Sequence, residues 1–164
     1  MPSFDVIAQG LPFEAAIEYF RKKLNLPTAT WTDIWHEMHA RSFVVAGAMR
    51  DDMLADFRAA IDKGIADGTT LREFRTDFDR IVSRYGWSYK GGRGWRTNII
   101  FNTNLRVAYQ VGHYRQMTDP DVLEARPLWR YSAVMDGRTR PLHASWHNTV
   151  LPYDHPWWQT HYPP

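Results

Sequence analysis

The sequence contains no cysteine, no long apolar run and, over residues 80–118, no acidic residue. Without cysteine the chain forms no disulfide and offers no thiolate to a metal ion. Its longest apolar run, residues 43–49, is far shorter than the roughly 20 residues of a membrane-spanning helix. The first residues, MPSFDVIAQG, lack the basic region and apolar block of a secretory signal. We therefore expect a soluble protein made in a cytoplasm, with no membrane association.

The acid-free stretch concentrates positive charge in a chain whose net charge is only +2. Its loop KGGRGWR precedes a predicted helix, and the free N–H groups of a helix start attract phosphate. The loop does not match the P-loop pattern, so a nucleotide-binding fold is not supported. The candidate DNA-binding residues are Lys90, Arg93, Arg96 and Arg106, with Trp87, Tyr89 and Trp95 available for stacking on bases. An equally weighted alternative is a solvated hinge loop whose arginines face water.

The hydrophobic pattern predicts an α+β fold that is mainly α-helical, with a helical body and a small C-terminal knob containing a short β-hairpin. We expect the body to span residues 1–118, with a basic loop at 86–96, and the knob to span 119–164. Apolar residues at helical spacing predict helices over 12–24, from Thr30 or Thr32 through 61, over 71–81 and over 96–117. Thr70 and Glu73 form a capping-box pattern before the third of these.

In the knob, WRYSAVMD alternates as a half-buried strand does, with Trp129, Tyr131, Ala133 and Met135 on one face. A turn at 136–137, a short helix over 141–146 and a second strand in NTVLP follow. The tail YDHPWWQTHYPP is rich in aromatic residues and proline, which predicts an irregular strap. We expect its aromatic residues, Trp157, Trp158 and Tyr162, to be exposed at an interface.

The segment DGRTRPLHASWH, residues 136–147, has two interpretations. In the first, His143 and His147, four residues apart, bind zinc with a third ligand from Asp136, His155 or His161. In the second, which we favour, Asp136, Arg138, Arg140 and His143 form a structural corner, because buried polar groups are usually paired. His36 and His39 offer a weaker second pair of metal ligands.

The structural interpretation makes specific expectations. Asp136 should accept hydrogen bonds from turn N–H groups and from Arg138 or Arg140. His143 should lie inside the knob, bonded to a backbone carbonyl or to Asp136, with His147 more exposed. No Ser-His-Asp or paired-carboxylate arrangement is evident, so we assign no catalytic residue, no cofactor and no resident metal.

Four segments carry a family likeness: PFEAAIEYFRKK, GTTLREFRTDFDRIVSRYGW, NIIFNTNLRVAYQVGHYRQM and the chain from RPLWRYSAVMDGRTRPLH to its end. In these segments the chain resembles the Mu F-like head morphogenesis proteins of tailed bacteriophages, also called minor head or minor capsid proteins. The most specific positions are these: Thr103, Asn104, Leu105, Arg106, Ala108, Tyr109, Asp136, Arg138, Arg140, His143, Asp154, Trp158, Pro163 and Pro164.

The resemblance implies a structural virion protein, not an enzyme, that acts in head morphogenesis. It also implies a location in the capsid interior or portal region after assembly in the host cytoplasm, and contact with the portal protein, the major capsid protein or packaged double-stranded DNA. The alternative of another class is a metal-dependent nuclease that uses the histidine-rich C-terminal motif. Because the family pattern continues into an Asn-Gly-Trp segment with two cysteines, we expect the chain to be truncated at Pro164. With those cysteines, the resemblance would allow His143 to join a Cys/His metal site.

Overall fold

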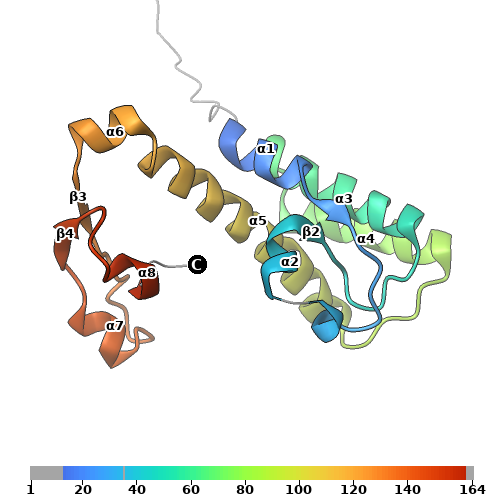
Figure 1. The fold of residues 1–164 in the computed structure, drawn as a ribbon. Coiled ribbons are helices and arrows are strands. Elements are labelled where there is room, and N and C mark those ends of the chain that lie inside the picture. The colour runs from blue at the N-terminus through green and yellow to red at the C-terminus, as the bar shows by residue number, and fades with distance from the viewer. Residues whose placement is uncertain (1–12, 35, 162–164) are drawn as a thin grey trace, which may run out of the picture. The chain divides into compact units, whose positions relative to one another are not determined.

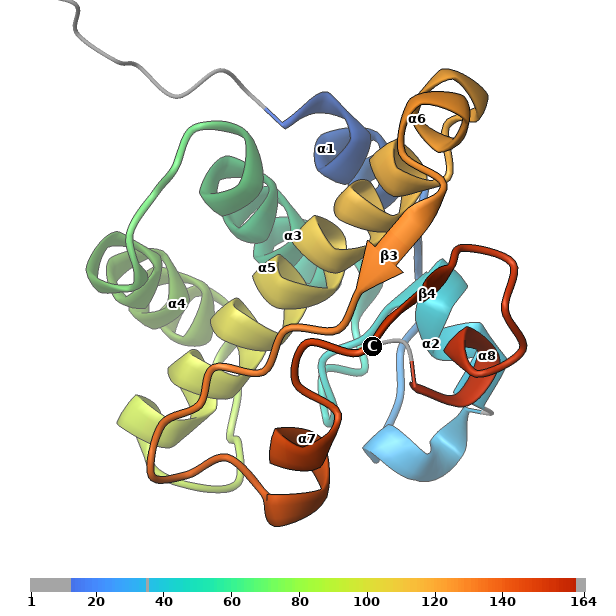
Figure 2. The ribbon, with the colours of Figure 1, turned by 90° about the vertical axis from the view of Figure 1, so that its left-hand side faces the viewer.

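The computed structural model, drawn from two directions in Figures 1 and 2, describes residues 13–34 and 36–161. These residues divide into two compact units. Unit 1 ends at His113 and unit 2 begins at Tyr114. Helices dominate and the few strands are short, so the predicted α+β, mainly α-helical class is confirmed. No helix in the described part of the chain is long and apolar enough to cross a membrane.

Unit 1 is a helical body built on α1 (Glu14–Arg21), α3 (Asp51–Ala66), α4 (Leu71–Tyr85) and the larger part of α5 (Arg93–Met117). Helix α3 runs beside both α1 and α4 (Figure 1). Each helix buries one apolar face, and burial of that surface is the main stabilising contribution. The largest fully buried side chains are Phe20, Phe43, Leu54, Phe57, Ile61, Phe74 and Phe78.

The second predicted helix, from Thr30 or Thr32 through residue 61, is wrong as a single element. The chain instead forms the 3₁₀ turn η1 (Trp31–Asp33), α2 (His36–Arg41) and β2 (Ser42–Phe43) before α3 begins at Asp51. Strand β2 pairs in parallel with β1 (Leu24–Asn25), so the first helix also ends earlier than predicted. Gly47, with φ of +81°, turns the chain out of any helical path.

Unit 2 contains α6 (Pro120–Ala125), β3 (Leu128–Arg130), α7 (Pro141–Ser145), β4 (Val150–Pro152) and α8 (Trp158–His161) (Figure 1). Strands β3 and β4 pair antiparallel, with Trp129 opposite Leu151. The predicted short helix and second strand of the knob are therefore present. They enclose a small aromatic core of Trp129, Tyr131 and Trp158.

Two expectations for this unit are wrong. The strand WRYSAVMD stops after Arg130, and Met135 is 52% exposed with φ of +58°, which is incompatible with a strand. Trp157 and Trp158 of the tail are not exposed as expected, because Trp158 is only 7% exposed, its ring centroid lies 5.7 Å from that of Trp129, and Trp157 is half-buried. These rings pack against one another inside the unit. Tyr162 lies outside the described residues.

Candidate functional site

The four candidate DNA-binding residues do not form one basic surface. Arg93 makes a two-point ion pair with Asp79, with Nε–Oδ1 and Nη2–Oδ2 distances of 2.7 and 2.6 Å. The hydrogen bond with Arg93 lowers the pKa of the Asp79 carboxyl below its usual value. At about 100° and 1.5 Å per residue along α5, Arg106 lies about 140° around and about 20 Å along the helix from Arg93. Lys90 and Arg106 are exposed.

Arg96 is turned into the body of unit 1. Its Nη2 donates to the carbonyl oxygen of Ala46, its guanidinium carbon lies 5.3 Å from the centre of the Trp87 ring, and burial lowers its pKa. Its Nε is buried without a hydrogen-bond partner among the described atoms. These contacts are those of a residue that anchors the loop before α5.

Two of the three loop aromatics are partly buried and pack against the core of unit 1. Trp87 donates from Nε1 to the carbonyl of Gly47 over 2.9 Å and packs against Phe57, while Tyr89 lies edge-on to Phe78. Trp95, at 57% exposure, is the one of the three stacking candidates that faces solvent. The sequence predicted that these rings are available to stack on bases, because a glycine-rich loop is typically flexible. In the structure, Trp87 and Tyr89 instead pack against α3 and α4.

The segment 136–147 forms a hydrogen-bonded corner. The Oδ1 of Asp136 accepts from the N–H of Arg138 over 2.9 Å and from the hydroxyl of Thr139 over 3.2 Å. Arg140 then precedes α7, whose first residue is Pro141, a position where the missing N–H of proline costs nothing. In the described part of the chain, no guanidinium bond to Asp136 is present, so the expected arginine partner is replaced by backbone and threonine donors.

The two histidines of the segment bond to different partners. Nδ1 of His143 lies 2.7 Å from the hydroxyl of Tyr131, in place of the expected Asp136 or backbone carbonyl. Nδ1 of His147 accepts from the N–H of Ala133 over 3.1 Å, and both histidines are half-buried. Within residues 13–34 and 36–161, no three or more His, Asp or Glu side chains are grouped so that they could hold a metal ion.

The Tyr131–His143 pair belongs to a layered aromatic cluster. The His161 ring stacks on Trp157 with centroids 4.1 Å apart and planes inclined by 11°, and Trp146 meets His161 edge-on at 4.5 Å. Nδ1 of His161 lies 2.8 Å from the carbonyl oxygen of Trp157. Such a cluster positions α7 against α8. An open groove of about 580 Å³ lies beside it and contains both arginines of the 136–140 corner in its lining.

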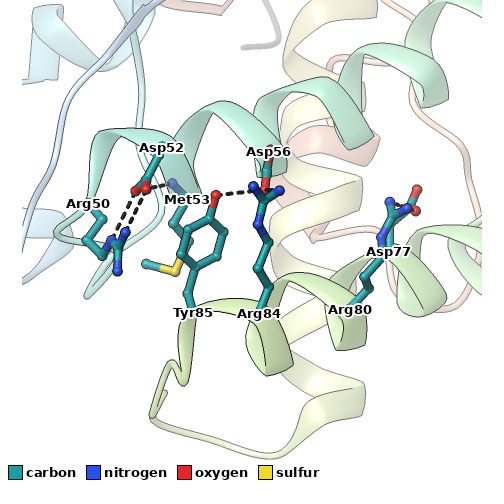
Figure 3. A network of polar contacts seen from close by, with 8 residues as sticks. All are labelled: Arg50, Asp52, Met53, Asp56, Asp77, Arg80, Arg84 and Tyr85. Carbon is teal, nitrogen blue, oxygen red and sulfur yellow. Dashed lines mark hydrogen bonds and ion pairs between the residues drawn. The ribbon is translucent and has the colours of Figure 1, made fainter.

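Sequence reasoning missed a charged network along the seam of α3 and α4, shown in Figure 3. Asp56 accepts from the Tyr85 hydroxyl over 2.9 Å and from Arg84 over 3.0 Å. Arg50 pairs with Asp52 and lies 4.9 Å from the Tyr85 ring centre (Figure 3). The hydrogen bond with Arg50 lowers the pKa of Asp52, and burial, with a smaller effect of Asp56, raises the pKa of Tyr85.

The network links the start of α3 to the end of α4, and its acidic and basic side chains are equal in number. A cavity of about 230 Å³ beside it is lined by both signs of charge, including Lys63, Asp77 and Arg80. The arrangement is therefore that of a structural seam. No local spacing signals the contacts of Asp56 with Arg84 and Tyr85 in the sequence, because these partners come from different helices.

The amino-acid sequence of the chain is similar to those of known phage and prophage proteins. Residues 55–164 match the family model described as Phage Mu protein F like protein. The chain is 39% identical over 171 aligned residues to the "Putative capsid assembly protein F" of Escherichia phage Mu, covering 96% of the chain and 38% of that protein. It is 34% identical over 147 residues to the "Mu-like prophage FluMu F protein" of Haemophilus influenzae, covering 84% of the chain and 35% of that protein.

The chain thus spans between a third and two fifths of the length of these relatives. No solved structure matches it significantly.

Proposed function

The chain belongs to the family of phage Mu protein F-like proteins, and from this premise we propose that it is a structural component of bacteriophage head morphogenesis. The observation that carries the proposal is the 39% identity, over nearly the whole chain, to a protein named as a putative capsid assembly protein. The geometry agrees with a structural role: many polar residues, such as Asp136 in the corner, Asp56 in the seam and Thr70 in the helix cap, make contacts that hold the fold.

The experiment is removal of the coding region for residues 55–164 from the genome that encodes the chain. We expect the yield of intact heads, counted by negative-stain electron microscopy after induction, to fall, and the chain with its natural flanking sequence supplied in trans to restore it. Unchanged head numbers in the deletion would contradict the proposal.

The partners that we propose are the portal protein, the major capsid protein or both, with the chain held in the capsid interior or portal region of a large virion assembly. Cross-linking of purified heads followed by mass spectrometry tests this directly. Cross-links from the chain to either protein are the expected result, and a chain absent from purified heads would refute a virion location.

We further propose that the exposed members of the basic segment contact packaged DNA. Arg93 and Arg96 already have partners in the fold, which leaves Lys90 and Arg106 to neutralise phosphates. Two phosphate contacts predict a slope of about −1.8 in a plot of log K against log salt concentration, whereas four would give about −3.6. Replacing Lys90 and Arg106 together by glutamine should flatten the slope. The matched control Arg93→Gln should leave it unchanged, because it breaks only an internal ion pair.

We propose no catalytic activity. Incubation of the purified chain with plasmid DNA and Mg²⁺, Mn²⁺ or Zn²⁺ should leave the DNA intact. Cleavage that disappears in a His143→Ala variant would replace the structural proposal with the nuclease alternative.

A further inference from the structure

The open groove of unit 2 is lined by two arginine residues whose charged groups make no contact that stabilises the described part of the fold. It is lined by residues of the 136–140 corner and by residues of α7 and α8, including His143 and His161. Arg138 and Arg140 line it and are exposed, and in the described part of the chain neither guanidinium has a hydrogen-bond or ion-pair partner. Their charges are therefore available to a ligand.

The acid that lines this groove, Asp136, makes no hydrogen bond or ion pair with either guanidinium among the described residues. Asp136 directs its Oδ1 to the N–H of Arg138 and to the hydroxyl of Thr139, which are donors of the corner itself. Guanidinium groups bind carboxylates through two parallel hydrogen bonds, and this geometry is both strong and specific. The lining of the groove thus combines two planar guanidinium groups with the aromatic residues Tyr131 and Trp146.

One exposed aliphatic residue lines the groove, and two further exposed apolar residues are chain neighbours of its lining residues. Val134, a lining residue, is 85% exposed, and its neighbour Met135 is 52% exposed in a left-handed conformation that methionine rarely adopts. Leu142, next to the lining residue His143, is 60% exposed. Arginine, methionine and aromatic residues are enriched in protein–protein interfaces. A nucleic acid would match the arginines but would leave these aliphatic side chains without an apolar partner.

We propose that this groove is a docking site for a protein segment in which aspartate or glutamate stands beside large apolar residues. The carboxylate pairs with Arg138 and Arg140, and the apolar side chains cover Val134, Met135 and Leu142. This surface is separate from the basic segment of unit 1, and its occupancy can be measured without head assembly. Failure of the docking test therefore leaves the proposed function standing.

The test is selection of a displayed random heptapeptide library on the immobilised 164-residue chain. Parallel selections use the Arg138→Gln/Arg140→Gln double variant and the matched control Arg130→Gln, which changes an exposed arginine of the same unit outside the groove. We expect wild type and control to enrich peptides that carry Asp or Glu next to Leu, Ile, Phe or Met, and the double variant not to enrich them.

Binding of the most enriched peptide is then measured by fluorescence anisotropy. Its Kd should rise about tenfold in the double variant and about threefold in Val134→Ser, with circular dichroism spectra unchanged because all three side chains are exposed. No enrichment by the wild type, or equal enrichment by the double variant, overturns the proposal. Tighter binding of single-stranded oligothymidine than of any selected peptide, lost in the double variant, also overturns it and assigns the groove to nucleic acid.

Discussion

Lys23 is a buried cation whose acceptors are neutral. Its side chain is 6% exposed, and Nζ donates to the carbonyl oxygens of His39 and Ser42 over 2.9 and 3.2 Å. Burial lowers its pKa from 10.5 to about 8. The lysine bridges the chain after α1 to the α2–β2 segment, at the energetic cost of removing an ammonium group from water.

This burial predicts a pH dependence of stability. Between pH 8 and 10.5 the unfolded chain keeps the Lys23 proton that the folded chain has released, so the free energy of unfolding rises with pH across this window. We expect a rise of about 2 kcal/mol that Lys23→Met abolishes. Urea unfolding from pH 7.5 to 10 measures it, with Lys22→Met, at an exposed neighbour, as control. Equal pH slopes in wild type and Lys23→Met would disprove the assignment.

Gly112 allows α1 to approach α5 closely. A Cβ at this position would lie 2.7 Å from the Phe13 ring and 3.0 Å from the backbone nitrogen of Ala16. Backbone cannot move aside as a flexible side chain can, so Gly112→Ala should destabilise unit 1 by about 1–3 kcal/mol in urea unfolding. Gly94→Ala, in the first turn of the same helix with no atom within 4 Å of the new Cβ, should instead stabilise by about 0.5 kcal/mol. Equal effects would refute the contact.

At the scale of the element, α4 is the helix whose local signals and structure agree most fully. Thr70 accepts from the N–H of Glu73 over 3.3 Å, and Glu73 accepts from the N–H of Thr70 over 2.8 Å. The hydrogen bonds from Thr70 lower the pKa of Glu73. At the other end Gly86, with φ of +57°, ends the helix in the left-handed conformation that favours glycine.

Removing this cap should weaken the helix measurably. Thr70→Ala is expected to lower the free energy of unfolding by about 1 kcal/mol, because it deprives the first turn of an acceptor. Thr76→Ala, the same change at an exposed interior position of α4, should stabilise by a few tenths of a kcal/mol through the better helix propensity of alanine. Thermal unfolding followed by circular dichroism at 222 nm compares the two. Destabilisation by both variants alike would argue against a specific role of the cap.

At the scale of the whole molecule, the two units have separate and unequal cores. Unit 1 buries a large set of aliphatic and aromatic side chains, whereas the core of unit 2 consists of Trp129, Tyr131 and Trp158 with partly buried neighbours. The predicted division after residue 118 remains a proposal about independent domains. The boundary between the two compact units along the chain, after His113, lies within α5.

If each unit is a cooperative domain, core substitutions should act on one transition at a time. Trp158→Ala should lower the stability of unit 2 by about 3–5 kcal/mol and leave unit 1 unaffected, and Phe57→Ala should do the reverse. Hydrogen exchange read by mass spectrometry resolves the two units in one experiment. A loss of protection in both units from either substitution would show that the chain unfolds as one domain.

Sequence alone determined those features whose causes are local. The mainly helical class, the capping box of α4, the proline that opens α7 and the turn at Asp136 follow from spacing, propensity and short-range hydrogen bonds. The resemblance to the family could also be recognised from the sequence alone, because it depends on residue identities along the chain. The sequence thus identified a phage Mu F-like chain without any coordinates.

Tertiary structure decided what depends on partners distant in the chain. Pairing of Ser42 with Leu24 ended a predicted helix, and Asp79 and the Ala46 carbonyl engaged two arginines that the sequence offered to DNA. Tyr131, twelve residues away in the chain, engaged His143 where Asp136 was expected. Conversely, Arg138 and Arg140, assigned to a structural corner, were left free to line a groove. Spacing shows which side chains share a face, but only packing shows which face is buried and which charge already has a partner.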